Sequence, residues 1–153
     1  MSHAPIIPPL AAHGHLALTE GELIAWGEAF GRAATAPLVV TITGDLGAGK
    51  TTLVQAICRG YGVREEVTSP TFALVHRYEA PRSSVYHLDL YRLDGPAELT
   101  NIAWDEIVSD EAIVLIEWPE RAGDRIPRVH VPISLQHLSD DPLRRLLYAG
   151  GHV

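Results

Sequence analysis

The order of apolar and polar positions along the chain predicts an alternation of helices and strands. Apolar residues recur at helical spacing over residues 20–34, and Thr19 with Glu22 forms a capping-box pattern at the start of this segment. The run 38–43 is rich in β-branched residues, which predicts a buried parallel strand. A second helix is predicted over residues 51–59. The first half of the chain thus predicts a helix, a buried strand and a second helix.

The second half of the chain predicts further strands, with one short helix among them. Residues 71–78 and 85–91 alternate like strands and are joined by a short link, so we expect an antiparallel hairpin. The remaining predicted elements are a short helix over 97–108, a buried strand over 112–117, a loop or single helical turn over 119–125, and closing strands over 128–136 and 144–149. The expected fold class is α/β, with a mixed parallel and antiparallel central sheet flanked by helices.

The length of 153 residues fits one domain with its own core. Residues 1–12 carry three prolines and are expected to form a flexible N-terminal arm, and residues 13–153 the single domain. No apolar run is long enough to span a bilayer and the start lacks the features of a signal peptide. We therefore expect a cytoplasmic protein that does not bind a membrane.

The net charge of -7 argues against direct binding to a nucleic acid, because that affinity comes from basic side chains that displace counterions. We expect no DNA binding, and contact with RNA only through a basic partner. Cys58 is the single cysteine, so the chain has no internal disulfide. Its place in an apolar helical pattern favours a buried hydrophobic role over a reactive thiol.

A glycine-rich loop lies between the predicted strand 38–43 and the helix that follows it. Residues 44–51 have the pattern G-x-x-x-x-G-K-T, in which loop amides surround phosphate groups. We expect Lys50 to reach the β- and γ-phosphates, and Thr51 to bind Mg²⁺ through its hydroxyl. The expected nucleotide-binding residues of this segment are Asp45, Leu46, Gly47, Ala48, Gly49, Lys50, Thr51 and Thr52.

Two carboxylates are candidates for the metal and for the attacking water. Glu117 directly follows an apolar strand, and the carboxyl ends of such strands form the ligand-binding edge of α/β sheets. Asp89 lies inside the predicted strand 85–91, where an ion pair with Arg92 or Arg77 is the alternative to a site role. With Lys50, these acids are the expected catalytic residues; which acid is the metal ligand and which orients water stays open.

Two further positions have both a structural and a functional interpretation. Trp118 follows Glu117 and either packs in the core or lies over the nucleotide or a partner. Ser69 and Thr71 flank a proline in a segment that resembles a switch, in which a hydroxyl senses the γ-phosphate, although a simple turn is the alternative.

Four sequence blocks, taken together and in order, resemble the TsaE (YjeE) family. The blocks are 44–52, 69–72, 89–93 and 117–120, and they stretch over about half of the chain. The resemblance implies a P-loop ATPase that hydrolyses ATP slowly and works with the TsaD and TsaB subunits. These attach a threonylcarbamoyl group to adenosine 37 of tRNAs that read codons starting with A, so tRNA would be met only through the partners.

The resemblance also implies roles for single residues. The positions that match the family's phosphate, metal, switch, acid and aromatic positions are Lys50, Thr51, Thr71, Asp89, Glu117 and Trp118. The chain departs from the family at Ala103, where a glycine is usual, which puts the local turn in question. Ala17-Leu18-Thr19-Glu20 only partly fits the segment that the family places near the base.

Two other classes of function use the same loop. A small-molecule kinase would need an arginine-rich lid, and the sequence shows no such insertion. A nucleotide-gated binding module would need no efficient hydrolysis. No arginine is clearly placed as a finger, so Arg92 or a partner residue would have to act as one, and weak intrinsic hydrolysis is expected.

Overall fold

The structure is a computed structural model that describes residues 14–45, 47–69 and 74–149. In chain order its elements are β1 (His15–Thr19), α1 (Glu20–Ala33), β2 (Leu38–Gly44), α2 (Lys50–Tyr61), β3 (Val75–Glu79), β4 (Ser84–Asp89), η1 (Pro96–Ile102), α3 (Trp104–Val108), β5 (Ile113–Glu117), η2 (Pro119–Arg125), β6 (Val131–His137) and β7 (Arg144–Ala149), where η marks a 3₁₀ helix.

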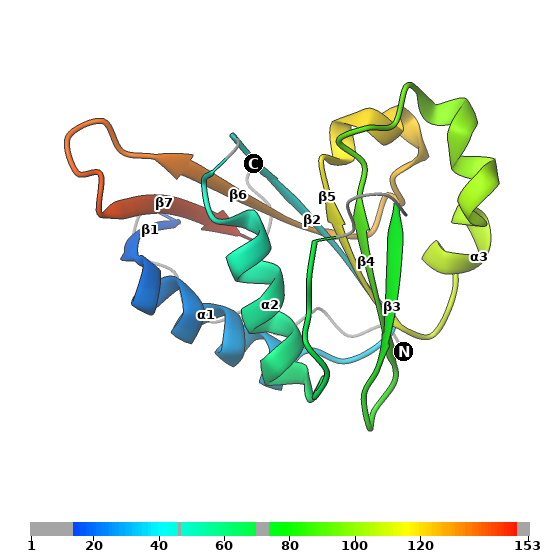
Figure 1. Cartoon of the computed structure of the whole chain (residues 1–153), viewed down its shortest axis with the longest axis horizontal. Helices are drawn as coiled ribbons and strands as arrows, with labels where there is room; N and C mark the ends of the chain where they lie inside the picture. Colours follow the sequence, from blue (N-terminus) through cyan, green and yellow to red (C-terminus); the bar gives the residue numbers. More distant parts are fainter. Residues whose placement is uncertain (1–13, 46, 70–73, 150–153) are drawn as a thin grey trace.

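The strands of the described residues form one seven-stranded sheet in the order β1-β7-β6-β2-β5-β4-β3 (Figure 1). The four central strands β6, β2, β5 and β4 run parallel to one another. The outer strands β7, β1 and β3 pair antiparallel to their neighbours. The expected mixed sheet is confirmed, and the carboxyl ends of β2, β4 and β5 meet at one edge of it.

Helices cover both faces of this sheet (Figure 1). One apolar cluster joins α1 and α2 to the face that carries Leu115, and a second joins η1, α3 and η2 to the face that carries Val114 and Ile116. Side chains alternate between the faces of a strand, so Glu117 lies on the same face as Leu115. The acid at the end of β5 is therefore directed to the side of the sheet that holds α2.

The two helices α1 and α2 pack closely against each other through glycines. A Cβ atom on Gly31 would lie 2.1 Å from the carbonyl oxygen of Ile57, and one on Gly60 would lie 2.1 Å from that of Glu28. Any side chain at either position would push the helices apart. This contact holds α2, whose first residue is Lys50, directly against α1.

Several predicted elements are confirmed. Helix α1 begins after the Thr19–Glu22 capping box, and in that box each side chain accepts a hydrogen bond from the other residue's backbone N–H. The predicted strand 144–149 matches β7, and the predicted hairpin is the antiparallel pair β3–β4. The start of the first hairpin strand, 71–73, lies outside the described residues.

The predicted helix over 97–108 is wrong as a single element. This segment instead contains two helices, η1 and α3. They are separated by Ala103, which has a φ of 58° and a ψ of 43°. The Ala103 N–H bonds back to the carbonyls of Leu99 and Thr100, which closes η1. The left-handed turn that was in question is thus present with alanine, although glycine would adopt it with less strain.

Two strand boundaries also differ from the prediction. Strand β4 ends at Asp89, not at residue 91, so Asp89 stands at the strand end and not inside it. The strand predicted over 128–136 is β6, which runs from Val131 to His137. In addition, β1, over His15–Thr19, was not predicted. β1 is short and acquires its hydrogen bonds from β7, more than a hundred residues later, so no local pattern marks it strongly.

Candidate nucleotide-binding site

The glycine-rich loop connects the end of β2 to the start of α2. Gly44, Gly47 and Gly49 all have positive φ, of 150°, 79° and 103°, which only glycine adopts easily. A Cβ atom on Gly44 would lie 2.4 Å from the carbonyl oxygen of Leu135, whereas nothing lies within 4 Å of one on Gly47. The glycines therefore serve a specific loop conformation. Leu46 lies outside the described residues.

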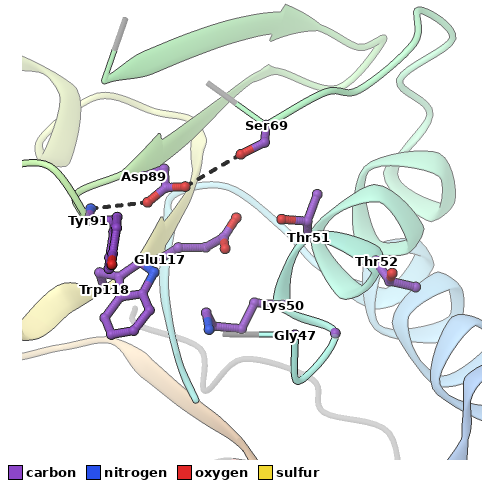
Figure 2. A pocket seen from close by; sticks show the side chains of 10 residues that line it. Gly47, Lys50, Thr51, Thr52, Ser69, Asp89, Tyr91, Glu117 and Trp118 are labelled. Carbon is purple, nitrogen blue, oxygen red and sulfur yellow. Dashed lines mark hydrogen bonds between the residues drawn. The ribbon is translucent and has the colours of Figure 1, made fainter. Parts of the chain in front are cut away.

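A pocket of about 360 Å³ opens beside this loop, at the carboxyl edge of the central strands (Figure 2). It is lined by Gly47, Gly49, Lys50, Thr51, Thr52, Ser69, Asp89, Tyr91, Glu117 and Trp118. The loop, the first turn of α2, the end of β4 and the end of β5 all contribute. Nine of the predicted site residues therefore gather in one place; Ala48 is buried behind the loop.

Lys50 places a cation in this pocket. Its side chain is largely buried, and its ammonium donates to the backbone carbonyls of Gly44 and Asp45. The ammonium also lies 4.5 Å from the centre of the Trp118 ring. Burial lowers the pKa of Lys50, and the negative charge of Glu117 opposes this shift most strongly. Lys50 is the only lysine of the sequence.

The two predicted acids are direct neighbours across β4 and β5. Asp89 and Glu117 are paired residues in the parallel register, so both side chains leave the same face of the sheet. Asp89 accepts hydrogen bonds from the Tyr91 backbone N–H, at 3.1 Å, and from the Ser69 hydroxyl, at 3.4 Å. Burial raises the pKa of Asp89, and the negative charge of Glu117 adds to the rise.

The alternative of an ion pair at Asp89 is not observed in the described part of the chain. Arg77 instead pairs with Glu79, at 3.0 Å, on the outer strand β3. Glu117 is only 2% exposed and accepts a 2.6 Å hydrogen bond from the His87 ring. The two acids thus have different surroundings: Asp89 is held by a hydroxyl and a backbone amide, and Glu117 by an imidazole.

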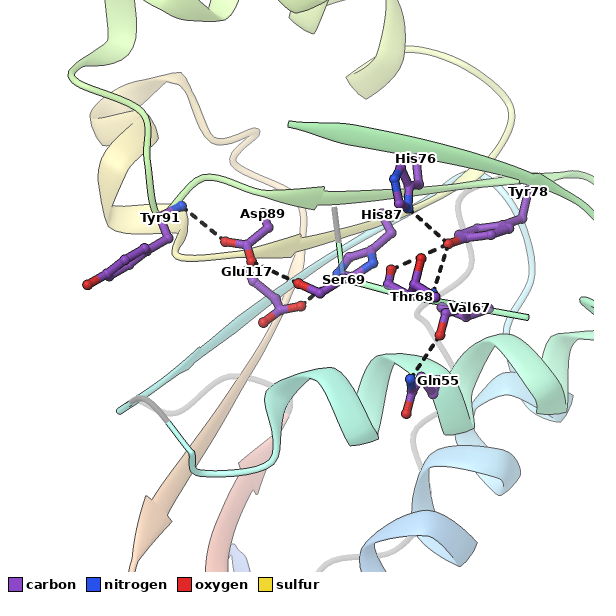
Figure 3. A network of polar contacts seen from close by, with 10 residues as sticks. All are labelled: Gln55, Val67, Thr68, Ser69, His76, Tyr78, His87, Asp89, Tyr91 and Glu117. Atoms are coloured by element: carbon purple, nitrogen blue, oxygen red, sulfur yellow. Dashed lines mark hydrogen bonds and ion pairs between the residues drawn. The ribbon is translucent and has the colours of Figure 1, made fainter. Parts of the chain in front are cut away.

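The segment before Ser69 is anchored both to α2 and to β3 (Figure 3). From α2, the Gln55 amide donates to the carbonyl of Val67 at 2.8 Å. From β3, the Tyr78 hydroxyl accepts from the backbone N–H of Thr68 at 3.2 Å. These contacts place Ser69 beside Asp89 at the pocket. Thr71, the other switch candidate, lies outside the described residues.

The sequence that forms this fold and pocket matches a known protein family. A family model described as "Threonylcarbamoyl adenosine biosynthesis protein TsaE" matches residues 18–146. The chain belongs to the TsaE family.

Individual relatives agree with this membership. The TsaE protein of Treponema pallidum is 40% identical over 115 residues, which is 75% of this chain and 84% of the relative. That of a Nostoc species is 46% identical over 72% of this chain and 70% of the relative. The crystal structure of Bacillus subtilis YdiB superposes with a TM-score of 0.72 at 26% identity, over 89% of this chain and 85% of that one.

Two side chains of this TsaE protein's site were missed by sequence reasoning. Tyr91 lines the pocket, and its ring centre lies 4.9 Å from that of Trp118. His87 bonds to Glu117 from inside the core. Both lie two residues from Asp89, and such a spacing on a strand places His87 on the face that Asp89 uses. A polar residue at that spacing was the available signal for His87.

Trp118 combines both of its proposed locations. Its ring lines the pocket and also packs against the second apolar cluster. Its backbone has a φ of 58° and ψ of 50°, a left-handed conformation that is costly for a bulky residue. The turn at Trp118 brings the ring back over Lys50 directly after Glu117.

Thr51, Asp89 and Glu117 offer a hydroxyl and two carboxylates, which are the oxygen ligands that Mg²⁺ prefers. Within the described residues no three His, Cys, Asp or Glu side chains gather into a metal site of their own. A P-loop metal shares its coordination between a few protein oxygens and phosphates, so the donors of this pocket fit such an ion.

Two remaining features concern residues away from the pocket. Cys58 is buried in α2, and burial raises the pKa of its thiol to about 12, which agrees with a hydrophobic role. Among the described helices, none is long and apolar enough to cross a membrane.

Proposed function

We propose that this protein binds ATP and Mg²⁺ and hydrolyses ATP slowly. We further propose that it works with TsaD and TsaB in forming threonylcarbamoyladenosine at position 37 of tRNAs that read ANN codons. The observation that carries the proposal is the convergence of Lys50, Thr51, Asp89 and Glu117 in one pocket beside a glycine-rich loop. The membership in the TsaE family supports the pathway.

The loop and the first turn of α2 form the proposed phosphate site. Helix α2 begins at Lys50, and its unpaired N–H groups with the helix dipole attract an anion. The ammonium of Lys50 is already held at the pocket by the carbonyls of Gly44 and Asp45. In the proposed complex, β- and γ-phosphate oxygens take over as acceptors of these N–H groups.

The acids and Thr51 form the proposed metal and water site. Thr51 and Glu117 hold the metal, directly or through water, and Mg²⁺ supplies neutralisation of the charge on the phosphates when it is bound. Asp89 orients the attacking water and accepts its proton. The raised pKa of Asp89 supports this division, because a more basic carboxylate is the better proton acceptor.

Slow hydrolysis by the isolated protein is part of the proposal. Lys50 is the cationic side chain that lines the described pocket. A catalytic arginine raises the rate of related enzymes by a factor of about 10³–10⁵. If a partner supplied this arginine, hydrolysis would depend on the partner. A net charge of -7 also favours contact with tRNA through partners.

The test is phosphate release by the purified chain alone, and then with TsaD and TsaB added. The proposal predicts slow release alone and faster release with both subunits present. Steady transfer of phosphate to a small acceptor would instead identify a kinase. Nucleotide-dependent binding to the subunits with no added hydrolysis would identify a binding module, and no binding at all would overturn the assigned partners.

A further inference from the structure

A histidine contacts the acid of β5 from the side opposite the pocket. His87 is fully buried, and its Nε2 lies 2.6 Å from Oε2 of Glu117. His87 does not line the pocket, whereas Glu117 does. Figure 3 shows the ring on β4, reaching across to the carboxylate on β5. The imidazole therefore touches the acid and not the space that a nucleotide would fill.

This contact follows from the sheet register. Asp89 and Glu117 are paired residues of β4 and β5, and His87 lies two residues before Asp89 on the same face. His87 therefore lies deeper in the sheet than the two acids, which share one register position at the strand ends. Its imidazole forms a hydrogen bond with one carboxylate oxygen of Glu117 from the core side, while the carboxylate itself points into the pocket (Figure 2).

Burial of this pair costs solvation free energy, and filling the same volume does not require that cost. A buried carboxylate without a donor is strongly destabilised by the loss of its solvation, and apolar side chains of similar volume would avoid that cost. Around the pair lie apolar residues of the first cluster, such as Val85 and Leu115. Within the described structure, Nδ1 of His87 has no hydrogen-bond partner, so the ring's polar contact is directed at Glu117.

We propose that His87 is a positioning residue that holds the Glu117 carboxylate in the orientation needed to bind the metal of the metal–nucleotide complex. This inference rests on the proposed function, since it assigns His87 a role at the same site. Partners that orient a metal ligand typically affect metal affinity or activity by about 10- to 100-fold. The same range is expected here.

Two matched variants separate the hydrogen bond from the shape of the side chain. His87→Gln keeps an N–H donor at the distance of Nε2 from the backbone, and His87→Asn keeps a polar amide but brings it one methylene short of Glu117. The probe is Mn²⁺, whose affinity for the protein–ADP complex is measured by electron paramagnetic resonance. The thermal midpoint and the ADP affinity in EDTA are measured in parallel.

The expected result is a loss of Mn²⁺ affinity of about 10- to 100-fold in His87→Asn, with near wild-type affinity in His87→Gln. ADP affinity in EDTA should be similar in both, since the phosphate loop is intact. In a Glu117→Gln background, His87→Asn should add no further loss of Mn²⁺ affinity, because its effect passes through the carboxylate.

Each of the following results would overturn the inference. Wild-type Mn²⁺ affinity in a folded His87→Asn, with only a lowered thermal midpoint, would show a merely structural pair. Equal loss in both variants, or an added loss in the Glu117→Gln background, would show that the ring acts by another route. If His87→Asn does not fold, His87→Gln decides: wild-type affinity supports the inference and a tenfold loss overturns it. Failure of the wild-type protein to bind ADP and Mn²⁺ would refute the proposed function instead.

Discussion

The ammonium of Lys50 lies 4.5 Å from the centre of the Trp118 ring. Lys50 begins α2 and Trp118 follows β5, so this contact joins the glycine-rich loop to the strand that carries Glu117. A cation over an indole face is stabilised by about 0.5–2 kcal/mol, depending on its desolvation. The aromatic ring therefore helps to hold the ammonium in the pocket between the loop and the two acids.

Replacement of Lys50 by alanine is expected to weaken ATP binding by at least about tenfold, since a hydrogen bond to a charged group contributes about 1.5–3 kcal/mol. Isothermal titration calorimetry measures the affinity and circular dichroism the fold. The control is Arg59→Ala, which removes a cation from the far, exposed end of the same helix. Unchanged affinity in folded Lys50→Ala would contradict a phosphate role for this residue.

The single lysine makes the pKa shift directly measurable. Burial favours the neutral amine, so the pKa of Lys50 lies below that of a free lysine and acylation should begin at lower pH. An amine-reactive reagent, followed by mass spectrometry of the Lys50 peptide between about pH 7 and 11, gives the titration curve. ATP with Mg²⁺ should slow the reaction. Equal labelling with and without nucleotide would place the nucleotide elsewhere.

Trp118→Leu is expected to weaken nucleotide binding by about 2- to 30-fold, because it removes the aromatic face from Lys50. Trp118→Phe keeps an aromatic ring and should lose less. Equilibrium binding of ADP measures both. If phenylalanine and leucine behave alike, the ring contributes through packing against Tyr91 and not through its face.

Asp89→Asn is expected to raise the thermal midpoint near pH 7 while it lowers ATP hydrolysis. The pKa of Asp89 is raised in the folded protein, so the folded state holds the proton to higher pH than the unfolded chain does. Ionisation of this carboxylate therefore costs stability above the unfolded pKa, and a neutral amide avoids the cost. Thermal midpoints from about pH 4 to 8 test this, and the difference should vanish toward about pH 4, where the unfolded carboxyl also holds its proton. A constant difference over that range would contradict the assignment.

Two loop glycines should respond differently to alanine. Gly47→Ala meets open space and is expected to cost about 1–2 kcal/mol, from the positive φ alone. In Gly44→Ala the added Cβ meets the carbonyl oxygen of Leu135 at 2.4 Å, and the overlap adds about 1–3 kcal/mol to the strain. Urea unfolding of the two variants compares them. Equal destabilisation would mean that the loop relaxes away from β6.

The predicted residues that the structure brings together at the pocket rest on short stretches of sequence. The loop from Gly44 to Thr51 could be predicted because its glycine spacing and its flanking strand and helix are all encoded within a few neighbouring residues. Glu117 was found because an apolar strand runs directly into it. The helix 97–108 was wrong because the left-handed turn at Ala103 has no glycine to mark it.

By itself, the sequence determined the glycine-rich loop, the capped start of α1 and the acid at the end of β5, because these depend on φ angles, hydrogen bonds and apolar patterns within a few residues. The tertiary structure decided what those residues face. Asp89 lies beside Glu117, and His87 behind it, only because β4 and β5 pair in one parallel register. Such pairing depends on the order of the strands and on the packing of helices on both faces, which no local stretch of the chain encodes.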